Sequence, residues 1–436
     1  MTTQNRGSIA KVVSASLIGT TIEWYDFFLY TSAAALVFGK LFFPGNDPLT
    51  GTLLAFLTYA VGFLARPIGG LVFGHFGDRV GRKKMLVTAL LMMGIGTFAI
   101  GLLPTYASIG IAAPILLVAL RIMQGIALGG EFAGAALMVV EHKDASNRRG
   151  FFGAWVGSAS PIGYILAAGL IALVSAFMSE DAFNSWGWRI PFLFSAIMVL
   201  VGLYIRLQLE ESSAFQELKS DDTSVEKVKL PIVELVRRFP KQILCSIGAG
   251  LGIHAGYYLS IIFGLAYART EVGFSSTLSL VLVLIASVVF FFAILLSGHL
   301  SDKLGRRVPM MFGVTGFGIW GFILFPLLDT GEAVPAGIGF SVGLFFLGCL
   351  YGPISAWLAE LFGTEVRYTG LSFGFTLAAV IGGGLIPLAA VYLLDEFGST
   401  VPISIVVATI SSIAFFTLAV TKLAVHHTDK DMSGVN

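Results

Sequence analysis

Charged residues are scarce in this chain. Aspartate, glutamate, lysine and arginine make up 12% of the 436 residues, whereas apolar residues make up 56%, and the mean hydropathy is +0.87. A soluble globule of this length needs far more polar surface than that. The shortage of charge therefore excludes a soluble protein and indicates a polytopic membrane protein.

Other absences narrow the class. The two cysteines, Cys245 and Cys349, lie inside apolar segments, so no disulfide framework is predicted. The chain has no histidine pair with zinc spacing, no cysteine cluster and no nucleophile elbow. A Gly-x-Gly-x-x-Gly match at 316–321 lies in an apolar run without a preceding strand, which argues against a dinucleotide site. We therefore expect no enzyme, no cofactor and no metal.

Long apolar segments are abundant. An α-helix needs about 20 such residues to cross a hydrocarbon core roughly 30 Å thick, and the segments here do not alternate as barrel strands would. We predict an all-α fold of twelve transmembrane helices, near residues 10–38, 52–75, 84–106, 110–141, 150–178, 188–208, 241–268, 275–299, 308–328, 334–361, 368–394 and 400–424.

One polar stretch occurs twice. Gly74-His-Phe-Gly77-Asp78-Arg79-Val-Gly81-Arg82 recurs 224 residues later as Gly298-His-Leu-Ser301-Asp302-Lys-Leu-Gly305-Arg306. A period of half the chain indicates duplication of a whole domain. We predict two six-helix halves, 1–208 and 241–425, joined by a linker at 209–240 and followed by a tail at 426–436.

The composition of this stretch predicts its local structure. Glycine permits a tight turn, aspartate can cap the following helix, and lysine and arginine resist crossing the bilayer. Most basic residues of the predicted loops fall on the same side as these two stretches, whereas acidic residues dominate the other side. This imbalance places both termini and the linker in the cytoplasm, and the protein in the cell membrane.

Ionisable residues inside the predicted spans are the main functional signal. Each costs about 2.5–3.5 kcal/mol at a helix centre unless it is paired or hydrated. Nearly all lie in the first half: Glu23, Asp26, Arg66, Arg121 and Glu131, with Tyr30 continuing the face of Glu23 and Asp26 and Gln124 following Arg121.

These charges are unequal in number. The helical rise places Glu23, Arg66 and Glu131 at similar depth, with Asp26 and Arg121 nearer the middle. Three acids against two bases leave one carboxylate without a basic partner, and in low dielectric such a group is easily protonated, as a proton carrier must be. The alternative is a static ion-pair network that holds the helices together. For Arg66, which precedes Pro67, both interpretations stay open.

The second half has little charge in its spans. Its polar candidates are His254, Tyr257 and Tyr258 on the seventh predicted helix. His254 and Tyr258 stand four residues apart, so they could line one wall of a cavity. Each is a candidate for substrate binding, against the alternative of a packing residue with a satisfied hydrogen bond.

Several motifs together resemble the major facilitator superfamily, and within it the metabolite:proton symporter family of shikimate, 2-oxoglutarate, citrate and proline/betaine carriers. They are the doubled basic loop, Glu23-Trp-Tyr-Asp26-Phe27, Arg66-Pro-Ile-Gly-Gly70, Arg121-Ile-Met-Gln124-Gly125, Gly129-Gly-Glu131-Phe132 and Glu360-Leu-Phe-Gly-Thr-Glu-Val-Arg-Tyr-Thr-Gly370.

The resemblance implies alternating access, with substrate bound near mid-membrane. The doubled loop would then be a conformational latch formed by Gly74, Asp78, Arg79, Gly81, Arg82, Asp302, Gly305 and Arg306. Ser301 replaces Gly77 in the second copy, so the two copies need not latch equally.

These observations lead to one hypothesis, the proton-coupled uptake of a small organic acid such as shikimate, a dicarboxylate or an aromatic acid. Arg121, with Arg66, attracts the carboxylate, and Asp26 or Glu131 carries the proton with Glu23 beside them. Alternatives are a proline/betaine-type zwitterion symporter, a proton-driven exporter and a non-transporting membrane receptor. The expected partners are lipid, protons and the substrate, with no nucleic acid, and the chain is expected to act as a monomer.

Overall fold

The computed structural model describes residues 8–44, 48–208, 231–363 and 366–432, and all regular elements in these ranges are helices. Ten helical stretches of the described residues are long and apolar enough to cross a membrane. The other two predicted spans are occupied by α1 (Ile9–Ala33), which carries Glu23 and Asp26, and α3 (Pro48–Val80). The predicted all-α polytopic fold is confirmed.

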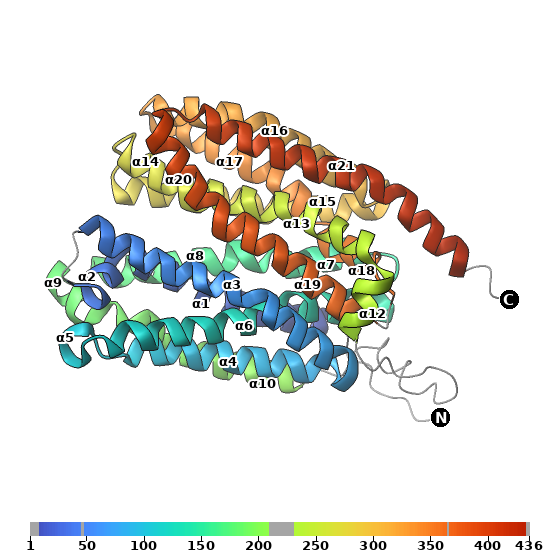
Figure 1. Ribbon diagram of the computed structural model, residues 1–436, viewed down its shortest axis with the longest axis horizontal. Coiled ribbons are helices and arrows are strands. Elements are labelled where there is room, and N and C mark those ends of the chain that lie inside the picture. Colours follow the sequence, from blue (N-terminus) through green and yellow to red (C-terminus); the bar gives the residue numbers. More distant parts are fainter. Residues whose placement is uncertain (1–7, 45–47, 209–230, 364–365, 433–436) are drawn as a thin grey trace. The chain divides into compact units, whose positions relative to one another are not determined.

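The described chain divides into two compact units, residues 1–142 with 159–223 and residues 143–158 with 224–436. Besides α1 and α3, unit 1 contains α2 (Gly39–Phe42), α4 (Arg82–Leu102), α5 (Tyr106–Ile109), α6 (Ala112–Val140), α8 (Ala159–Ala176), α9 (Glu180–Ala182) and α10 (Arg189–Leu207). Figure 1 shows the long helices of this unit running side by side.

Unit 2 contains α7 (Arg149–Gly157), α12 (Pro231–Arg238), α13 (Pro240–Tyr258), α14 (Gly264–Thr270), α15 (Ser276–Leu304), α16 (Arg307–Asp329), α17 (Ala333–Tyr351), α18 (Ile354–Ala359), α19 (Arg367–Ala379), α20 (Ile386–Phe397) and α21 (Val401–Met432). The predicted linker lies mostly outside the described residues, at 209–230, and its remainder forms α12. The predicted tail begins as the last turns of α21 rather than as a separate segment, and 433–436 lie outside the description.

The two units repeat one packing scheme. In unit 1, α1 packs on α8 and α10, and α3, α4 and α6 pack on one another, with α10 against α4. In unit 2, α13 packs on α19 and α21, and α15, α16 and α17 pack in the same way, with α21 against α16. π-Helical segments also recur at matching places, Ala34–Phe38 after α1 and Leu259–Phe263 after α13. These repeated features support duplication of a helical domain.

Residues 143–158 depart from the predicted half boundary. They group with unit 2 because α7 packs on α15 and α18, although the sequence places them in the first half. The predicted six-helix boundaries therefore stay a prediction.

Glycines allow α3 and α6 to cross with their backbones in contact. A Cβ on Gly129 would overlap the carbonyl oxygen of Arg66, and one on Gly69 would overlap that of Ile126. Close backbone approach through small residues drives helix association in membranes, where apolar burial alone gives little preference for a neighbouring helix over lipid. This crossing holds Arg66 and Glu131 in fixed relation to one another.

We expect Gly129→Ala to destabilise the protein by about 1–3 kcal/mol, because the added methyl group must push α3 away from α6. Thermal unfolding of the purified protein measures this. Gly169→Ala is the matched control, since a Cβ there meets nothing within 4 Å and alanine favours a helix by roughly 0.5–1 kcal/mol over glycine. Equal Tm changes of the same sign in the two variants would contradict the assignment.

Candidate functional site

An arginine absent from the predicted site is at the centre of one charge cluster in unit 1. Arg206, in the last turn of α10, forms ion pairs with Glu131 on α6 and Glu23 on α1; the Arg206 Nη2 to Glu23 Oε1 distance is 3.3 Å. It also donates to Glu131 Oε2 at 3.2 Å and to the Leu86 carbonyl at 2.5 Å. All three charged side chains are buried.

Arg206 corrects the predicted charge count. With it, the buried ionisable groups of this region number three acids and three bases, so the count alone leaves no odd carboxylate. Arg206 lies inside the predicted span 188–208, near its end, but was not among the predicted site residues. Helical side chains point back toward the N-terminus, and Gly19 on α1 leaves the space that the Arg206 guanidinium fills. The signal that was available is the excess of buried carboxylates, which demands a further cation.

Asp26 is separate from that cluster. Its side chain is fully buried, and neither carboxyl oxygen has a hydrogen-bond partner among the described residues. The Thr97 hydroxyl of α4 lies beside the carboxyl without completing a hydrogen bond to it in this conformation. Asp26 is thus the carboxyl of the predicted set that is not held by a base.

Arg121 is held by polar and aromatic neighbours. Its Nη1 donates to Gln124 Oε1 at 3.1 Å, and Gln124 Nε2 donates to Thr97 Oγ1 at 2.8 Å. The guanidinium carbon lies 3.9 Å from the centre of the Tyr30 ring, and the Tyr30 hydroxyl bonds to Thr58 Oγ1. The structure therefore brings together three predicted site residues, Arg121, Gln124 and Tyr30.

Arg66 also lies against aromatic rings. Its guanidinium carbon is 4.1 Å from the centre of the Phe63 ring and 4.8 Å from that of Phe27, and Phe27 in turn lies 5.4 Å from the guanidinium carbon of Arg121. No ion pair of the buried Arg66 is formed within the described part of the chain. Glu23 and Glu131, which were expected at a depth similar to that of Arg66, form their ion pairs with Arg206 instead.

The candidates of unit 2 form an aromatic cluster. The ring of His254 stacks on that of Tyr258 at 6.3 Å and lies 4.5 Å from Phe375. The centre of the Tyr257 ring lies 5.5 Å from the ring centres of Tyr258 and Phe290. All three predicted residues are buried. His254 and Tyr258 thus lie together, as their spacing predicts, among aromatic rings.

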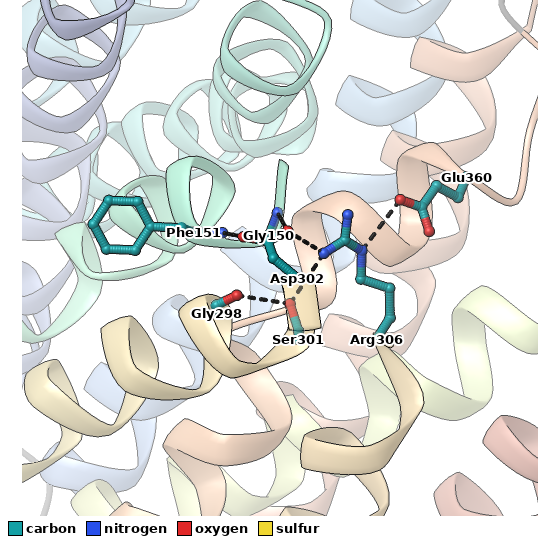
Figure 2. Close-up of polar contacts among 7 residues, drawn as sticks. All are labelled: Gly150, Phe151, Gly298, Ser301, Asp302, Arg306 and Glu360. Atoms are coloured by element: carbon teal, nitrogen blue, oxygen red, sulfur yellow. Dashed lines mark hydrogen bonds and ion pairs between the residues drawn. The ribbon is translucent and has the colours of Figure 1, made fainter. Parts of the chain in front are cut away.

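The second copy of the basic loop is anchored by Asp302 (Figure 2). Its carboxylate accepts the backbone N–H groups of Gly150 at 2.9 Å and Phe151 at 2.8 Å, the first turn of α7. Arg306 pairs with Asp302 and places its Nε 3.2 Å from Glu360 Oε1. A carboxylate at a helix start satisfies free N–H groups and interacts favourably with the helix dipole.

Ser301 completes this arrangement. Its hydroxyl donates to the Gly298 carbonyl at 2.7 Å and accepts from Arg306 Nη1 at 3.2 Å. The expectation that aspartate caps the following helix is wrong for this copy: no side chain caps α16, and Asp302 caps α7 instead. Sequence spacing could not show this, because α7 is 152 residues from Asp302.

The first copy has the same turn and a related ion pair. Gly81, with φ of 120°, is the one residue between α3 and α4, as Gly305, with φ of 83°, follows α15; only glycine adopts such angles readily. The Arg82 Nη1 to Glu141 Oε2 distance is 2.8 Å and both side chains are buried. Gly74 and Asp78 lie in the last turns of α3, as does the exposed Arg79.

The family follows from these features together with the sequence comparison. Residues 16–387 match the description Major Facilitator Superfamily. The chain belongs to this superfamily. It is therefore a secondary transporter with membrane-spanning helices, not an enzyme, and the predicted resemblance is confirmed.

Similar proteins support the placement within the superfamily. The chain is 40% identical to the inner membrane metabolite transport protein YhjE of Escherichia coli K12, over 89% of this chain and 88% of that one. It is 39% identical to the shikimate transporter of the same organism, over 88% and 87% of the two chains. It is 34% identical to the proline/betaine transporter of Salmonella typhimurium, over 89% and 79%. The predicted similarity to the metabolite:proton symporter family is confirmed.

A solved structure shows the same fold. The proton:xylose symporter XylE, bound to 6-bromo-6-deoxy-D-glucose, superposes with a TM-score of 0.77 over 96% of both chains at 17% sequence identity. At this identity the likeness concerns the fold alone.

We expect Arg206→Met to lower the stability by about 3–5 kcal/mol, because Glu23 and Glu131 would be left buried without their cation. The Tm of the purified protein measures the change. The matched variant Glu23→Gln/Glu131→Gln/Arg206→Met removes the whole cluster and should recover most of the loss. If the single variant is as stable as the unchanged protein, or the triple variant is the least stable, the ion-pair assignment is wrong.

Asp302→Asn should loosen the start of α7. The two charged oxygens of Asp302 each accept one backbone N–H group, whereas asparagine offers a single neutral oxygen for both. A lost helix cap costs about 0.5–2 kcal/mol, so amide hydrogen exchange in a peptide spanning 143–158 should become about 2- to 30-fold faster. Asp395→Asn, at an exposed acid in the last turn of α20, should leave this peptide unchanged. Unaltered exchange in Asp302→Asn would mean that the carboxylate does not hold α7.

Proposed function

We propose that this protein takes up a small organic acid together with protons across the inner membrane, by alternating access. The observation that carries the proposal is the buried guanidinium of Arg66, which faces aromatic rings and has no ion pair among the described residues. It occurs in the same unit as Asp26, a buried carboxyl without a hydrogen-bonded partner there.

The interaction energies of Arg66 favour an anionic substrate. Cation–π contacts contribute about 0.5–2 kcal/mol, whereas an arginine within the membrane costs roughly 2.5–3.5 kcal/mol or more. The rings of Phe27 and Phe63 therefore offset only part of the cost of Arg66. A substrate carboxylate supplies the missing counter-charge, and a planar guanidinium binds it with two parallel hydrogen bonds. Arg121, fixed by Gln124 and Tyr30, supplies a second cation for the same purpose.

Asp26 is the proposed proton carrier. Glu23 and Glu131 share Arg206, so they are held in a paired cluster, whereas no base of the described residues pairs with Asp26. A proton on Asp26 removes the cost of that buried charge, which links proton uptake to movement of the site through the bilayer. This narrows the sequence prediction, which left Asp26 and Glu131 as alternative proton carriers with Glu23 beside them.

Coupling to protons suits an anion. A carboxylate that enters alone moves against the inward-negative membrane potential, at a cost of about 2.3 kcal/mol per charge at 100 mV. One or more accompanying protons neutralise or reverse the transported charge. The doubled basic loop serves as the latch, through the bonds of Asp302 to the start of α7 and through the Arg82–Glu141 pair. We place both termini in the cytoplasm and propose that the monomer is sufficient.

A zwitterionic betaine is the second candidate, and the aromatic cluster of unit 2 is the observation that favours it. Aromatic faces such as those of Tyr257, Tyr258 and Phe375 can bind a quaternary ammonium group. In unit 1 the faces of Phe27, Phe63 and Tyr30 are already occupied by guanidinium groups. A relative that is a proline/betaine transporter keeps this candidate open beside the shikimate transporter.

Proteoliposomes with an imposed pH gradient, acidic outside, test the proposal. Radiolabelled shikimate, 2-oxoglutarate, benzoate and glycine betaine represent the four substrate classes. We expect one of the three acids to accumulate, Asp26→Asn to abolish accumulation while substrate exchange continues, and Arg66→Gln to weaken apparent affinity about tenfold or more, as loss of a charge-assisted hydrogen bond predicts.

Arg269→Gln is the matched control for Arg66→Gln, because Arg269 is exposed at the end of α14; it should keep the unchanged affinity. Accumulation with normal pH dependence in Asp26→Asn would refute the assignment of the proton to Asp26, and the same result in Glu131→Gln would exclude Glu131 as its replacement. Accumulation of glycine betaine and none of the acids would replace the organic acid by the second candidate. Efflux driven by the opposite gradient would make the protein an exporter.

A further inference from the structure

A continuous set of polar contacts connects the proposed substrate arginine to the region of the proposed proton carrier. Arg121 donates to Gln124, and Gln124 donates to Thr97 on the neighbouring helix α4. Thr97 Oγ1 donates in turn to the Met93 carbonyl at 3.1 Å, while its hydroxyl lies beside the Asp26 carboxyl. Arg121, Gln124, Thr97 and Asp26 are all buried.

We propose that Thr97 and Gln124 form a relay that makes the hold on Arg121 depend on whether Asp26 carries a proton. The inference rests on the proposed function, in which Arg121 attracts the substrate and Asp26 carries the proton. Thr97 and Gln124 are positioning residues in it. They act on Arg121 and Asp26 rather than on the substrate.

The hydrogen-bond capacity of a threonine hydroxyl explains how the relay works. The group has one proton to donate and two lone pairs to accept with. In this structure the proton is directed to Met93, Gln124 occupies one lone pair, and the second lone pair is left for a proton donor. A protonated Asp26 can therefore donate to Thr97 without disturbing the rest of the relay.

When Asp26 is ionised, the direction of the hydrogen bond between Asp26 and Thr97 reverses, and Thr97 becomes the donor. A carboxylate is the stronger acceptor, because hydrogen bonds to a charged group are about twice as strong as neutral ones. The Thr97 proton then turns from the Met93 carbonyl to Asp26. A hydroxyl that donates to a charge becomes a better acceptor, so Gln124 is drawn toward Thr97 and its carbonyl oxygen binds Arg121 more firmly. Protonation loosens Arg121 and frees it for a substrate carboxylate.

Packing keeps the relay in register. A Cβ on Gly96 would lie 2.9 Å from Gln124 Cγ, and one on Gly62 would lie 3.2 Å from Arg121 Nε, so both polar side chains are enclosed by neighbouring helices. Among the described residues, the other charged or titratable groups of this part of unit 1 are Tyr25 and Tyr30 on α1 and Arg66 on α3, with the Glu23–Glu131–Arg206 cluster beyond them. Tyr25, the neighbour of Asp26 in the chain, donates its hydroxyl to the Pro191 carbonyl at 2.8 Å. Arg206 donates to the two glutamates and to the Leu86 carbonyl, so that cluster is a separate system.

Infrared spectroscopy of the purified protein tests the relay without any substrate. The probe is the proton itself: the carbonyl stretch of protonated Asp26 is the band that Asp26→Asn removes at acidic pH. We expect this band to shift in Thr97→Val, which keeps the shape but removes the hydroxyl, and to return in Thr97→Ser. Gln124→Leu should also shift it, although Gln124 makes its bond to Thr97 and not to Asp26.

Thr88→Val is the matched control. Thr88 is on the same helix and donates to a carbonyl four residues back at 3.0 Å, as Thr97 does, but it is exposed; the band should not move. A band unchanged in Thr97→Val, or moved equally in Thr97→Ser, overturns the role of the hydroxyl. A band that moves in Thr97→Val but not in Gln124→Leu limits Thr97 to a local contact and overturns the relay. Should Thr97→Val not fold, Gln124→Leu and Thr97→Ser decide between these outcomes.

Transport separates the relay from the proposed function. With whichever of shikimate, 2-oxoglutarate, benzoate or glycine betaine is transported, the ratio of accumulation to exchange should fall about tenfold in Thr97→Val, as loss of a bond to a charged group predicts. A destabilised protein would lose both activities in proportion, which would count against the relay. Absence of transport in the unchanged protein refutes the proposed function, whereas the infrared result still decides whether Asp26 and Arg121 are connected.

Discussion

The cost of placing charge in a hydrocarbon medium governs this structure. Each ionised side chain in a span must be compensated, and unit 1 uses three kinds of compensation. Glu23 and Glu131 share Arg206, and Arg66 lies against aromatic rings. Arg121 donates to the side-chain amide of Gln124 and lies over the ring of Tyr30. Among the described residues Asp26 has none of these, and this difference is the basis for proposing Asp26 as the proton carrier.

Duplication has preserved the helix packing but not the chemistry. The two units pair corresponding helices in the same way, and each carries a glycine with positive φ in its basic loop. Charge is concentrated in unit 1, whereas the corresponding helix of unit 2 offers His254, Tyr257 and Tyr258. The ion pairs of the two loops differ as well. Arg82 pairs with Glu141, and both side chains are buried, whereas Arg306 pairs with both Asp302 and Glu360. One backbone scheme therefore carries two different sets of side-chain interactions.

The sequence was sufficient for the architecture because each span is encoded locally. A long apolar segment predicts a membrane-spanning helix, and glycine beside basic residues predicts a loop. The structure has a helix at each of the twelve predicted spans. The site was predicted in part: Arg121, Gln124 and Tyr30 come together because they share helix faces. Arg206, Thr97 and the capping of α7 by Asp302 were missed, since each depends on which helices become neighbours, and the spacing of residues along one helix carries no such information. Thr97 in particular is an ordinary polar residue in an apolar run.

Glycine links the packing of unit 1 to its chemistry. Where two backbones cross, Gly69 and Gly129 bring α3 against α6. Where a long polar side chain must be enclosed, Gly19 leaves room for Arg206 and Gly96 for Gln124. A larger residue at either kind of position would separate helices or expel a charged group, and both changes would alter the spacing between Asp26, Thr97 and Arg121. The polar contacts of the candidate site therefore depend on the same small residues that allow the helices to associate, so we expect substitutions at these positions to change stability and the proposed proton coupling together.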